Sequence, residues 1–257
     1  MPYVNFEDSK IYYDIHGSGE PVLLLHGFLE NSSMWNDYAK ELSSTRQIIR
    51  VDLPGHGKSE NIEVHSMDKM AEAVLLVLAF LKIEKVKIIG HSMGGYVALA
   101  IADKTSNIAE GILLFFSSAS ADTTEKRENR DRLKVIVRND KQGFMRHAIP
   151  MLFTKETRQN FASELDEVIK EAQALNTQGI IKTLDGLKTR PNRQHLLQSN
   201  ISISFVSGNL DEAIPMKTLK TQHSAKAVKK VWRTENGHMG HIEDRDFCLI
   251  AIEKFIA

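Results

Sequence analysis

A serine lies between two glycines where the sequence changes from an apolar run to a helix-like run. Gly90, Ser92 and Gly94 belong to the segment KIIGHSMGGYVALA at residues 87–100. A nucleophile on so tight a turn takes strained backbone angles, and side chains two positions away on either side would collide with its neighbours. The pattern is therefore typical of a serine that attacks a carbonyl group. The same pattern also fits a strand end followed by a helix with Ser92 as its N-cap. Residues elsewhere in the chain are therefore needed to choose between a nucleophile and a helix cap.

Two loops late in the chain offer the acid and the base that such a serine needs. The segment FVSGNLDEAIP presents Asp211 with Glu212 beside it, and we favour Asp211 because the loop at a strand's carboxyl end is where the group is needed. The segment VWRTENGHMGHIED offers His238 and His241. We favour His238, which lies in the loop, over His241, which is nearer the closing helix. The chain order Ser92, Asp211, His238 is itself typical of one architecture.

Backbone donors for the same site are expected from the segment LLLHGF at residues 23–28. An acyl-transfer intermediate needs two donors near its oxyanion, and we predict the amides of Phe28 and Met93. His26 is then a scaffold residue; it is a weaker candidate for the base, which normally comes late in the chain. The pair His238 and His241 could also bind a metal ion, but no cysteine or carboxylate ligands accompany it, so we expect no metal.

Composition argues against several classes of function. The chain has 257 residues, 42% of them hydrophobic, which is enough for one sizeable core. Lys and Arg total 33, as do Asp and Glu, so neither nucleic acid nor an acidic membrane surface is expected as a partner. Cys248 is the single cysteine, which excludes an internal disulfide and indicates a core position. The N-terminal segment has no apolar run suited to export or a membrane span, so we expect a cytoplasmic protein.

The elements that must position these residues alternate along the chain. Residues 3–7 and 10–16 alternate polar and apolar side chains, which predicts an antiparallel pair. Later strands are short apolar runs, as expected for strands covered on both faces: PVLLLHG, QIIRVD, VKIIGH, GILLFF and ISISFVSG. Helix-length segments separate most of them, including residues 66–82 with Ser66 as N-cap. This predicts an α/β fold, a doubly wound and mainly parallel sheet with helices on both faces.

The alternation stops after residue 120 for about 80 residues. Four successive helices are predicted there, at 124–140, 141–153, 157–175 and 177–189. They give a helical cap at 121–200 inserted into a core domain of 1–120 and 201–257. The mixed charges of this insertion are better explained by a solvated outer face than by an anion site. Its apolar residues at helical spacing need burial; they are Phe144, Met145, Ile149, Leu152 and Phe153.

Taken together, these segments resemble the α/β-hydrolase superfamily, in its lid-bearing, esterase-like branch with the G-H-S-M-G-G elbow. The segments LLLHGFLENSSMW, IIRVDLPGHGKS, VKIIGHSMGGYVALA, FVSGNLDEAIP and ENGHMGHIED match it in order over most of the chain. The resemblance implies that Ser92 is the nucleophile, His238 the base and Asp211 the orienting acid. The family also carries the turn DLPGHGKS, and we assign its Asp52 and His56 to structure, because glycine density and Pro54 are typical of a tight loop. His91 and Glu243 are expected to support the site.

A serine hydrolase that cleaves esters through an acyl-enzyme is the function that the resemblance implies, with no metal or organic cofactor. Enzymes of this fold with carbon–carbon hydrolase, amidase or perhydrolase chemistry remain alternatives, as do triad-bearing small-molecule receptors, because fold and triad do not separate them. We expect a small-molecule substrate with short to medium acyl groups and a monomer or homodimer. The predicted apolar pocket is lined by Phe28, Trp35, Met93, Phe144, Met145 and Phe153.

Overall fold

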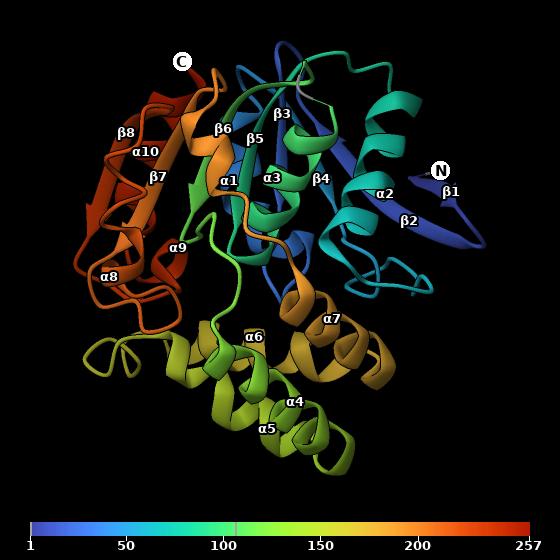
Figure 1. The fold of residues 1–257 in the computed structure, drawn as a ribbon, viewed down its shortest axis with the longest axis vertical. Coiled ribbons are helices and arrows are strands. Elements are labelled where there is room, and N and C mark those ends of the chain that lie inside the picture. Colours follow the sequence, from blue (N-terminus) through green and yellow to red (C-terminus); the bar gives the residue numbers. More distant parts are fainter. Residues whose placement is uncertain (1, 106) are drawn as a thin grey trace.

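The computed structural model describes residues 2–105 and 107–257. Over these residues an eight-stranded sheet runs through the centre of the molecule in the order β1-β2-β4-β3-β5-β6-β7-β8 (Figure 1). β1 pairs antiparallel with β2, and β2 with β4, whereas every other neighbouring pair is parallel. The strands are β1 (Tyr3–Phe6), β2 (Ser9–His16), β3 (Pro21–Leu25), β4 (Gln47–Val51), β5 (Val86–His91), β6 (Ala109–Phe115), β7 (Ile203–Gly208) and β8 (Val228–Thr234).

Helices connect the strands and cover both faces of the sheet. The α-helices are α1 (Asn36–Leu42), α2 (Met67–Phe80), α3 (Met93–Lys104), α4 (Thr124–Asn139), α5 (Lys141–Ala148), α6 (Ala162–Ala174), α7 (Thr177–Thr189), α8 (Met216–Leu219), α9 (Gly240–Glu243) and α10 (Arg245–Ile256). Short 3₁₀ turns are η1 (Ser32–Trp35), η2 (Pro150–Leu152) and η3 (Gln194–Gln198). No helix among the described residues has the length and apolarity needed to cross a bilayer.

Two apolar layers explain why the parallel strands read as continuous apolar runs. In β3, Leu23 and Leu25 pack on the side of α2 and α3, whereas Val22 and Leu24 pack on the side of α1 and α10. Successive side chains of a strand point to opposite faces, so a sheet covered on both sides needs apolar residues at every position. The predicted α/β fold with its mainly parallel sheet is confirmed. Cys248 is fully buried in the second layer, as expected.

The order of the strands determines where a site can form. β3 lies between β4 and β5, so the connection after β3 leaves toward β4 and the one after β5 leaves toward β6. A crevice opens at the carboxyl ends of strands where connections diverge in this way, and ligands bind there in open α/β sheets. The loops that follow β3 and β5 contain the predicted oxyanion donors and the predicted nucleophile.

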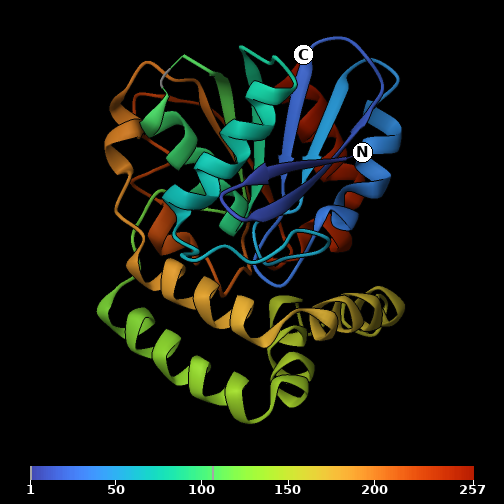
Figure 2. The same cartoon turned by 90° about the vertical axis from the view of Figure 1, so that its right-hand side faces the viewer.

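The segment between β6 and β7 packs across this edge of the sheet. Its helices α4, α5, α6 and α7 lie below the carboxyl ends of the strands, and α4 runs beside α7 (Figures 1 and 2). Their apolar faces form a third cluster, which includes Phe144, Met145 and Leu184, and which also contains Leu29 and Met239 from the loops of the sheet. We call residues 124–189 the helical insertion.

Two predicted helices of the insertion are shorter than expected. The helix predicted for 141–153 ends at Ala148. Ile149 is still helical (φ −66°, ψ −44°), but Pro150 has no backbone N–H to continue the hydrogen-bond ladder and begins the 3₁₀ turn η2 instead. The helix predicted to start at 157 begins at Ala162. Thr157 instead lies in a turn where its hydroxyl hydrogen-bonds Thr154 and Glu243.

Candidate active site

The turn at Ser92 joins β5 to α3 with the strained geometry that its glycines predict. Ser92 has φ +47° and ψ −110°, in the left-handed half of the map where non-glycine residues are uncommon. A Cβ atom on Gly90 would collide with the backbone of Gly94, and one on Gly94 with the carbonyl of Leu25. The turn is held by hydrogen bonds from the Ser92 amide to the Phe115 carbonyl (3.0 Å) and from the Ser117 hydroxyl to the Ser92 carbonyl (2.7 Å).

Three side chains from distant loops meet at this turn. His238 Nε2 lies 2.9 Å from Ser92 Oγ, and His238 Nδ1 lies 2.8 Å from Asp211 Oδ2. An ionised carboxylate only accepts hydrogen bonds, so Nδ1 carries the proton of the neutral ring and Nε2 is left to accept from the serine hydroxyl. The structure thus brings together the three residues predicted from the sequence, in the geometry of a nucleophile, a base and an orienting acid.

Asp211 is buried and remains a carboxylate. Burial raises the pKa of its carboxyl, but the charge and hydrogen bond of His238, with backbone amides of Ile214 and Ala213, outweigh burial and lower the pKa below its ordinary value. Its second oxygen accepts from the Ile214 amide at 2.8 Å. The competitor Glu212 is exposed. His241 makes no hydrogen bond to Ser92 within the described chain, and it lies 3.7 Å from Glu30 instead.

The loop after β3 borders the same cavity as Ser92. His26 stabilises it: Nδ1 lies 2.7 Å from the Gly27 carbonyl, and Nε2 accepts from the Leu53 amide at 2.9 Å. His26 is therefore a scaffold residue, as expected. For the described residues, no hydrogen bond is found from the amides of Phe28 and Met93, and both residues line the same cavity as Ser92. Asp52 accepts from the amides of Ser32 and Lys58, which is the structural role predicted for its turn.

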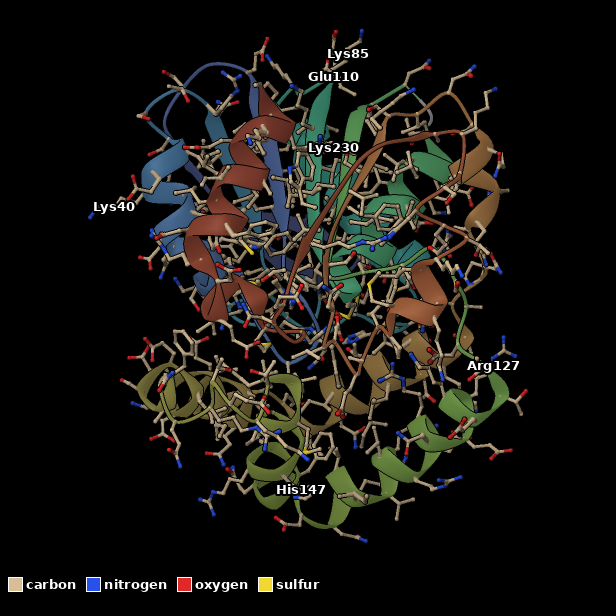
Figure 3. All side chains as sticks on the ribbon, turned by 90° about the vertical axis from the view of Figure 1, so that its left-hand side faces the viewer. Lys40, Lys85, Glu110, Arg127, His147 and Lys230 are labelled. Carbon is tan, nitrogen blue, oxygen red and sulfur yellow. The ribbon has the colours of Figure 1, made fainter. Side chains whose placement is uncertain are left out.

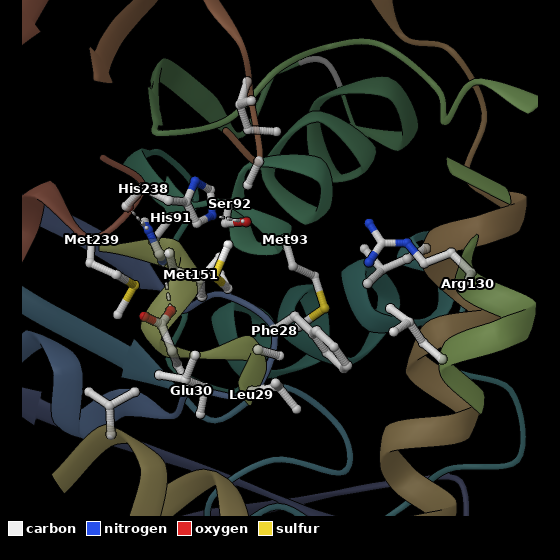
Figure 4. Close-up of a pocket in the computed structure, with 18 of the residues that line it drawn as sticks. Phe28, Leu29, Glu30, His91, Ser92, Met93, Arg130, Met151, His238 and Met239 are labelled. Atoms are coloured by element: carbon white, nitrogen blue, oxygen red, sulfur yellow. Dashed lines mark hydrogen bonds and ion pairs between the residues drawn. The ribbon is translucent and has the colours of Figure 1, made fainter. Parts of the chain in front are cut away.

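A cavity of about 310 Å³ opens beside Ser92 and His238, between the sheet and the helical insertion (Figure 4). Three of the predicted lining residues contribute to its wall, namely Phe28, Met93 and Phe144. Its other apolar lining residues include Leu29, Leu133, Ala148, Ile149, Met151, Leu152, Val168, Leu187, Ile214 and Met239. The size and the mainly apolar wall are typical of a small-molecule site.

Three residues predicted for this pocket lie elsewhere. Trp35 is fully buried against Tyr38 and Phe115, in the apolar layer on the far face of the sheet, because the helix that it precedes packs there. Met145 is fully buried within the insertion, where its side chain fills the space between helices. Phe153 packs in the same cluster and borders a separate cavity. The spacing predicted burial for the last two, but not the direction of each side chain.

Comparison with known proteins shows the family of the chain. The family model of the alpha/beta hydrolase fold matches residues 20–244. The chain belongs to the α/β-hydrolase family. A thermophilic esterase from Thermogutta terrifontis has a TM-score of 0.91 at 26% identity, with 99% of this chain and 96% of that chain covered. The esterase EaEST from Exiguobacterium antarcticum has a TM-score of 0.90 at 21% identity, with 99% and 98% covered, which concerns the fold alone.

A curated relative matches over a shorter stretch. The pimeloyl-[acyl-carrier protein] methyl ester esterase of Nitrosomonas europaea is 30% identical over 110 residues, which are 43% of this chain and 42% of that protein. The chain thus aligns with less than half the length of this relative. The structural neighbour from Thermogutta terrifontis makes this α/β-hydrolase esterase-like.

Glu30 links three parts of the hydrolase site, and sequence reasoning missed it. Its Oε2 accepts from the Gly27 amide, next to the Phe28 amide, and lies 2.7 Å from His91 Nδ1. His91 Nε2 in turn lies 3.2 Å from the His238 carbonyl. Burial raises the pKa of Glu30, but the charge and hydrogen bond of His91 outweigh it and lower this pKa to about 2. In the sequence, Glu30 is a carboxylate three residues after the His-Gly pair. Its importance follows only from its buried partners, which the sequence does not reveal.

The same buried group is a candidate metal centre by residue type. Glu30, His91 and His241 offer donor atoms that lie within 4.8 Å of one another. However, Oε2 of Glu30 is already engaged by the Gly27 amide and by His91 Nδ1, and Nε2 of His91 lies 3.2 Å from the His238 carbonyl. We interpret the group as a hydrogen-bonded carboxylate–imidazole network that supports the base loop.

The insertion also holds the loop that carries His238. The His238 amide donates to the Leu152 carbonyl at 2.9 Å, so η2 fixes the backbone of the predicted base. Glu243 accepts from the Thr154 amide at 2.8 Å and from the Gly237 amide at 3.1 Å. The expectation that His91 and Glu243 support the site agrees with these contacts. Residues 152–157 of the insertion therefore belong to the reacting end of the pocket.

The far end of the pocket is polar, which the sequence did not predict. Lys126, Asn129 and Arg130 of α4 line the cavity, although the charges of this helix were expected on a solvated outer face. Arg127 and His147 do lie on the outer side of the insertion (Figure 3). The interpretation is thus wrong for one face of α4. A signal existed, because Lys126, Asn129 and Arg130 continue the helical stripe of Leu133 and the buried Val137.

Proposed function

We propose that this protein is a serine hydrolase that cleaves carboxylic esters of small, largely apolar substrates through an acyl-enzyme. The observation that carries the proposal is the continuous chain of contacts from Ser92 Oγ to His238 Nε2 (2.9 Å) and from His238 Nδ1 to Asp211 (2.8 Å). Ser92 is the nucleophile, His238 the base and Asp211 the acid that orients it. Membership of the α/β-hydrolase family and the esterase-like neighbours support the same reaction class.

In the first half of the reaction His238 takes the Ser92 proton as Oγ bonds to the ester carbonyl carbon. Negative charge then develops on the carbonyl oxygen, where the amides of Phe28 and Met93 donate hydrogen bonds that the resting protein leaves unused. When the C–O bond breaks, protonated His238 gives its proton to the leaving alcohol. Asp211 stabilises the imidazolium and keeps its ring oriented.

In the second half a water molecule replaces the alcohol. His238 accepts a proton from the water as its oxygen bonds to the acyl carbon, and the proton returns to Ser92 Oγ when the ester bond to the enzyme breaks. Glu30 and His91 contact the Gly27 amide and the His238 carbonyl, so their network supports the loop after β3 and the loop that carries the base.

Labelling with a fluorophosphonate tests the nucleophile. The native chain is expected to react once, and peptide mapping is expected to place the adduct on Ser92. The Ser92→Ala variant and the heat-unfolded native chain serve as controls, and neither should be labelled. An adduct on a different serine, or equal labelling of Ser92→Ala, would overturn the assignment.

Turnover separates an enzyme from a receptor that keeps the same residues. We expect steady multiple turnover of a p-nitrophenyl ester by the native chain. A single slow turnover, accompanied by a large ligand-dependent rise in the melting temperature, would instead support a sensing function.

A further inference from the structure

Three polar side chains lie on one face of α4 and line the end of the pocket remote from Ser92. Lys126, Asn129 and Arg130 are three and four residues apart, so they share a helix face. In Figure 4, Ser92 and His238 lie at one side of the cavity and Arg130 at the other. The wall between them is apolar and includes Phe28, Met93, Leu133 and Phe144.

This end of the pocket carries more positive than negative charge. The buried carboxylate of Asp122 lies 2.7 Å from Arg190 and 3.2 Å from Arg130 Nε, so it is shared by two cations. Lys126 adds a third. Burial lowers the pKa of Lys126, and among the nearby charges Asp122 opposes this whereas Arg190 and Arg130 add to it. The other carboxylates of the site, Asp211 and Glu30, are occupied by histidines.

Some hydrogen-bond donors at the α4 end of the pocket have no acceptor among the described residues. Arg130 uses Nε for Asp122, and no acceptor for Nη1 or Nη2 is found among the described residues. Lys126 uses one of its three protons for the Ala213 carbonyl. A guanidinium and an ammonium group that face one cavity match the geometry and charge of a carboxylate.

We propose that the substrate is an ester whose acyl chain ends in a carboxylate, which Arg130 and Lys126 bind while Asn129 donates or accepts beside them. The proposal rests on the proposed ester hydrolysis at Ser92 and specifies its substrate class. The acyl part is assigned to the cavity because it stays bonded to Ser92 after the alcohol has left. The apolar wall then packs against the methylenes between the two ends of the acyl chain.

Matched pairs of esters test the proposal. The monomethyl esters of the straight dicarboxylic acids from succinic to suberic acid are compared with the ω-amides of the same half-esters, which have nearly the same shape but no charge. Hydrolysis is followed by product chromatography. At the best chain length, kcat/KM of the carboxylate is expected to exceed that of the amide by about 10- to 100-fold, the effect of one charge-assisted interaction.

Substitutions in α4 test which residue causes the preference for the carboxylate. Arg130→Gln should remove most of the preference for the carboxylate, measured as the ratio of kcat/KM for the carboxylate to kcat/KM for the amide. Arg130→Lys keeps the charge and should retain part of the preference. Arg127→Gln is the matched control, since Arg127 is exposed on the same helix outside the cavity (Figure 3). It removes one positive charge and should leave the preference unchanged.

A binding measurement separates the substrate class from the reaction. Calorimetry with the dicarboxylates, on Ser92→Ala and on Ser92→Ala combined with Arg130→Gln, should show binding that the second change weakens about 10- to 100-fold. The proposal would be overturned if the esters with an ω-amide were hydrolysed as fast as, or faster than, the esters with a carboxylate. Equal effects of Arg130→Gln and Arg127→Gln on the preference would also overturn it. Absence of turnover for every ester, with dicarboxylate binding intact, would contradict the ester hydrolase and leave the carboxylate site supported.

Discussion

At the reacting end of the pocket, polar side chains are buried and hydrogen-bonded to one another, whereas at the far end they retain unused donors. His238 is held by Asp211 through its ring and by Leu152 through its backbone. Within the described residues, Arg130 forms a hydrogen bond through Nε alone. The first arrangement fixes one geometry in advance, which is what a reaction requires. The second leaves hydrogen-bonding capacity for a ligand to satisfy, which is what recognition requires.

The two ends also come from different parts of the chain. Loops that follow β3, β5, β7 and β8 build the reacting end, and α4 of the helical insertion builds the far end. Substitutions in α4 can therefore change the substrate without moving the nucleophile. The exception is the stretch 152–157, which lies in the insertion but holds the loop of His238. Changes there should affect the reaction itself.

The largest expected effect distinguishes the two histidines at the reacting end. His238→Ala removes the group that contacts Ser92, so kcat should fall about a thousand- to a million-fold. His241→Ala should leave kcat within about tenfold, because the ring of His241 contacts Glu30 instead. Steady-state kinetics with a p-nitrophenyl ester measures both, and circular dichroism checks that each variant is folded. Near-native rates for His238→Ala, or a loss confined to His241→Ala, would show that the base is misassigned.

A smaller effect is expected for Glu30, which supports the reacting end through the Gly27 amide and His91. Glu30→Gln keeps the shape but removes the charge that faces His91, so kcat/KM should fall about tenfold and the unfolding free energy by about 1 to 3 kcal/mol. Glu212→Gln is the matched control, because it removes an exposed carboxylate beside Asp211. If Glu30→Gln and Glu212→Gln had equal kcat/KM, the charge of Glu30 would have no influence on the reaction.

The pH dependence of this stability difference identifies the charged pair. The pKa of Glu30 is lowered from 4.5 to about 2 in the folded chain, so its contribution is present above pH 4.5 and lost as the pH falls toward 2. The pKa of His91 is raised from 6.5, since Glu30 outweighs burial, so its contribution is present below pH 6.5 and lost as the pH rises through the folded value. Urea unfolding should therefore show the largest difference between native chain and Glu30→Gln from pH 4.5 to 6.5.

The same contrast explains what could be predicted from the sequence. The loops after β5, β7 and β8 were predictable, because a glycine-flanked serine and the order of acid and base restrict the possibilities. Glu30 was not, since the importance of a carboxylate depends on burial and on partners such as His91, 61 positions away. In α4, charged residues occur on all sides of the helix. Helical periodicity therefore predicts which residues share a face, but not which face borders the cavity. Leu133 and Val137 mark the stripe that includes Lys126 and Arg130, but the helix also carries the apolar Val135 and Ile136 on exposed faces, so apolarity alone does not identify the cavity face.

The smallest expected effect concerns the apolar wall between the two ends. Leu133 lines the cavity, whereas Val135 on the same helix is 54% exposed. Leu133→Ala removes methyl groups that contact the acyl chain, and each buried methylene contributes about 0.8 kcal/mol, or about fourfold in kcat/KM. The best chain length should therefore increase by one or two methylenes, because a longer chain fills the space that Leu133 leaves. Val135→Ala should leave the chain-length profile of the ester series unchanged. The same profile for both variants would mean that the acyl chain does not run along α4, and that the two ends of the cavity are not occupied by one molecule.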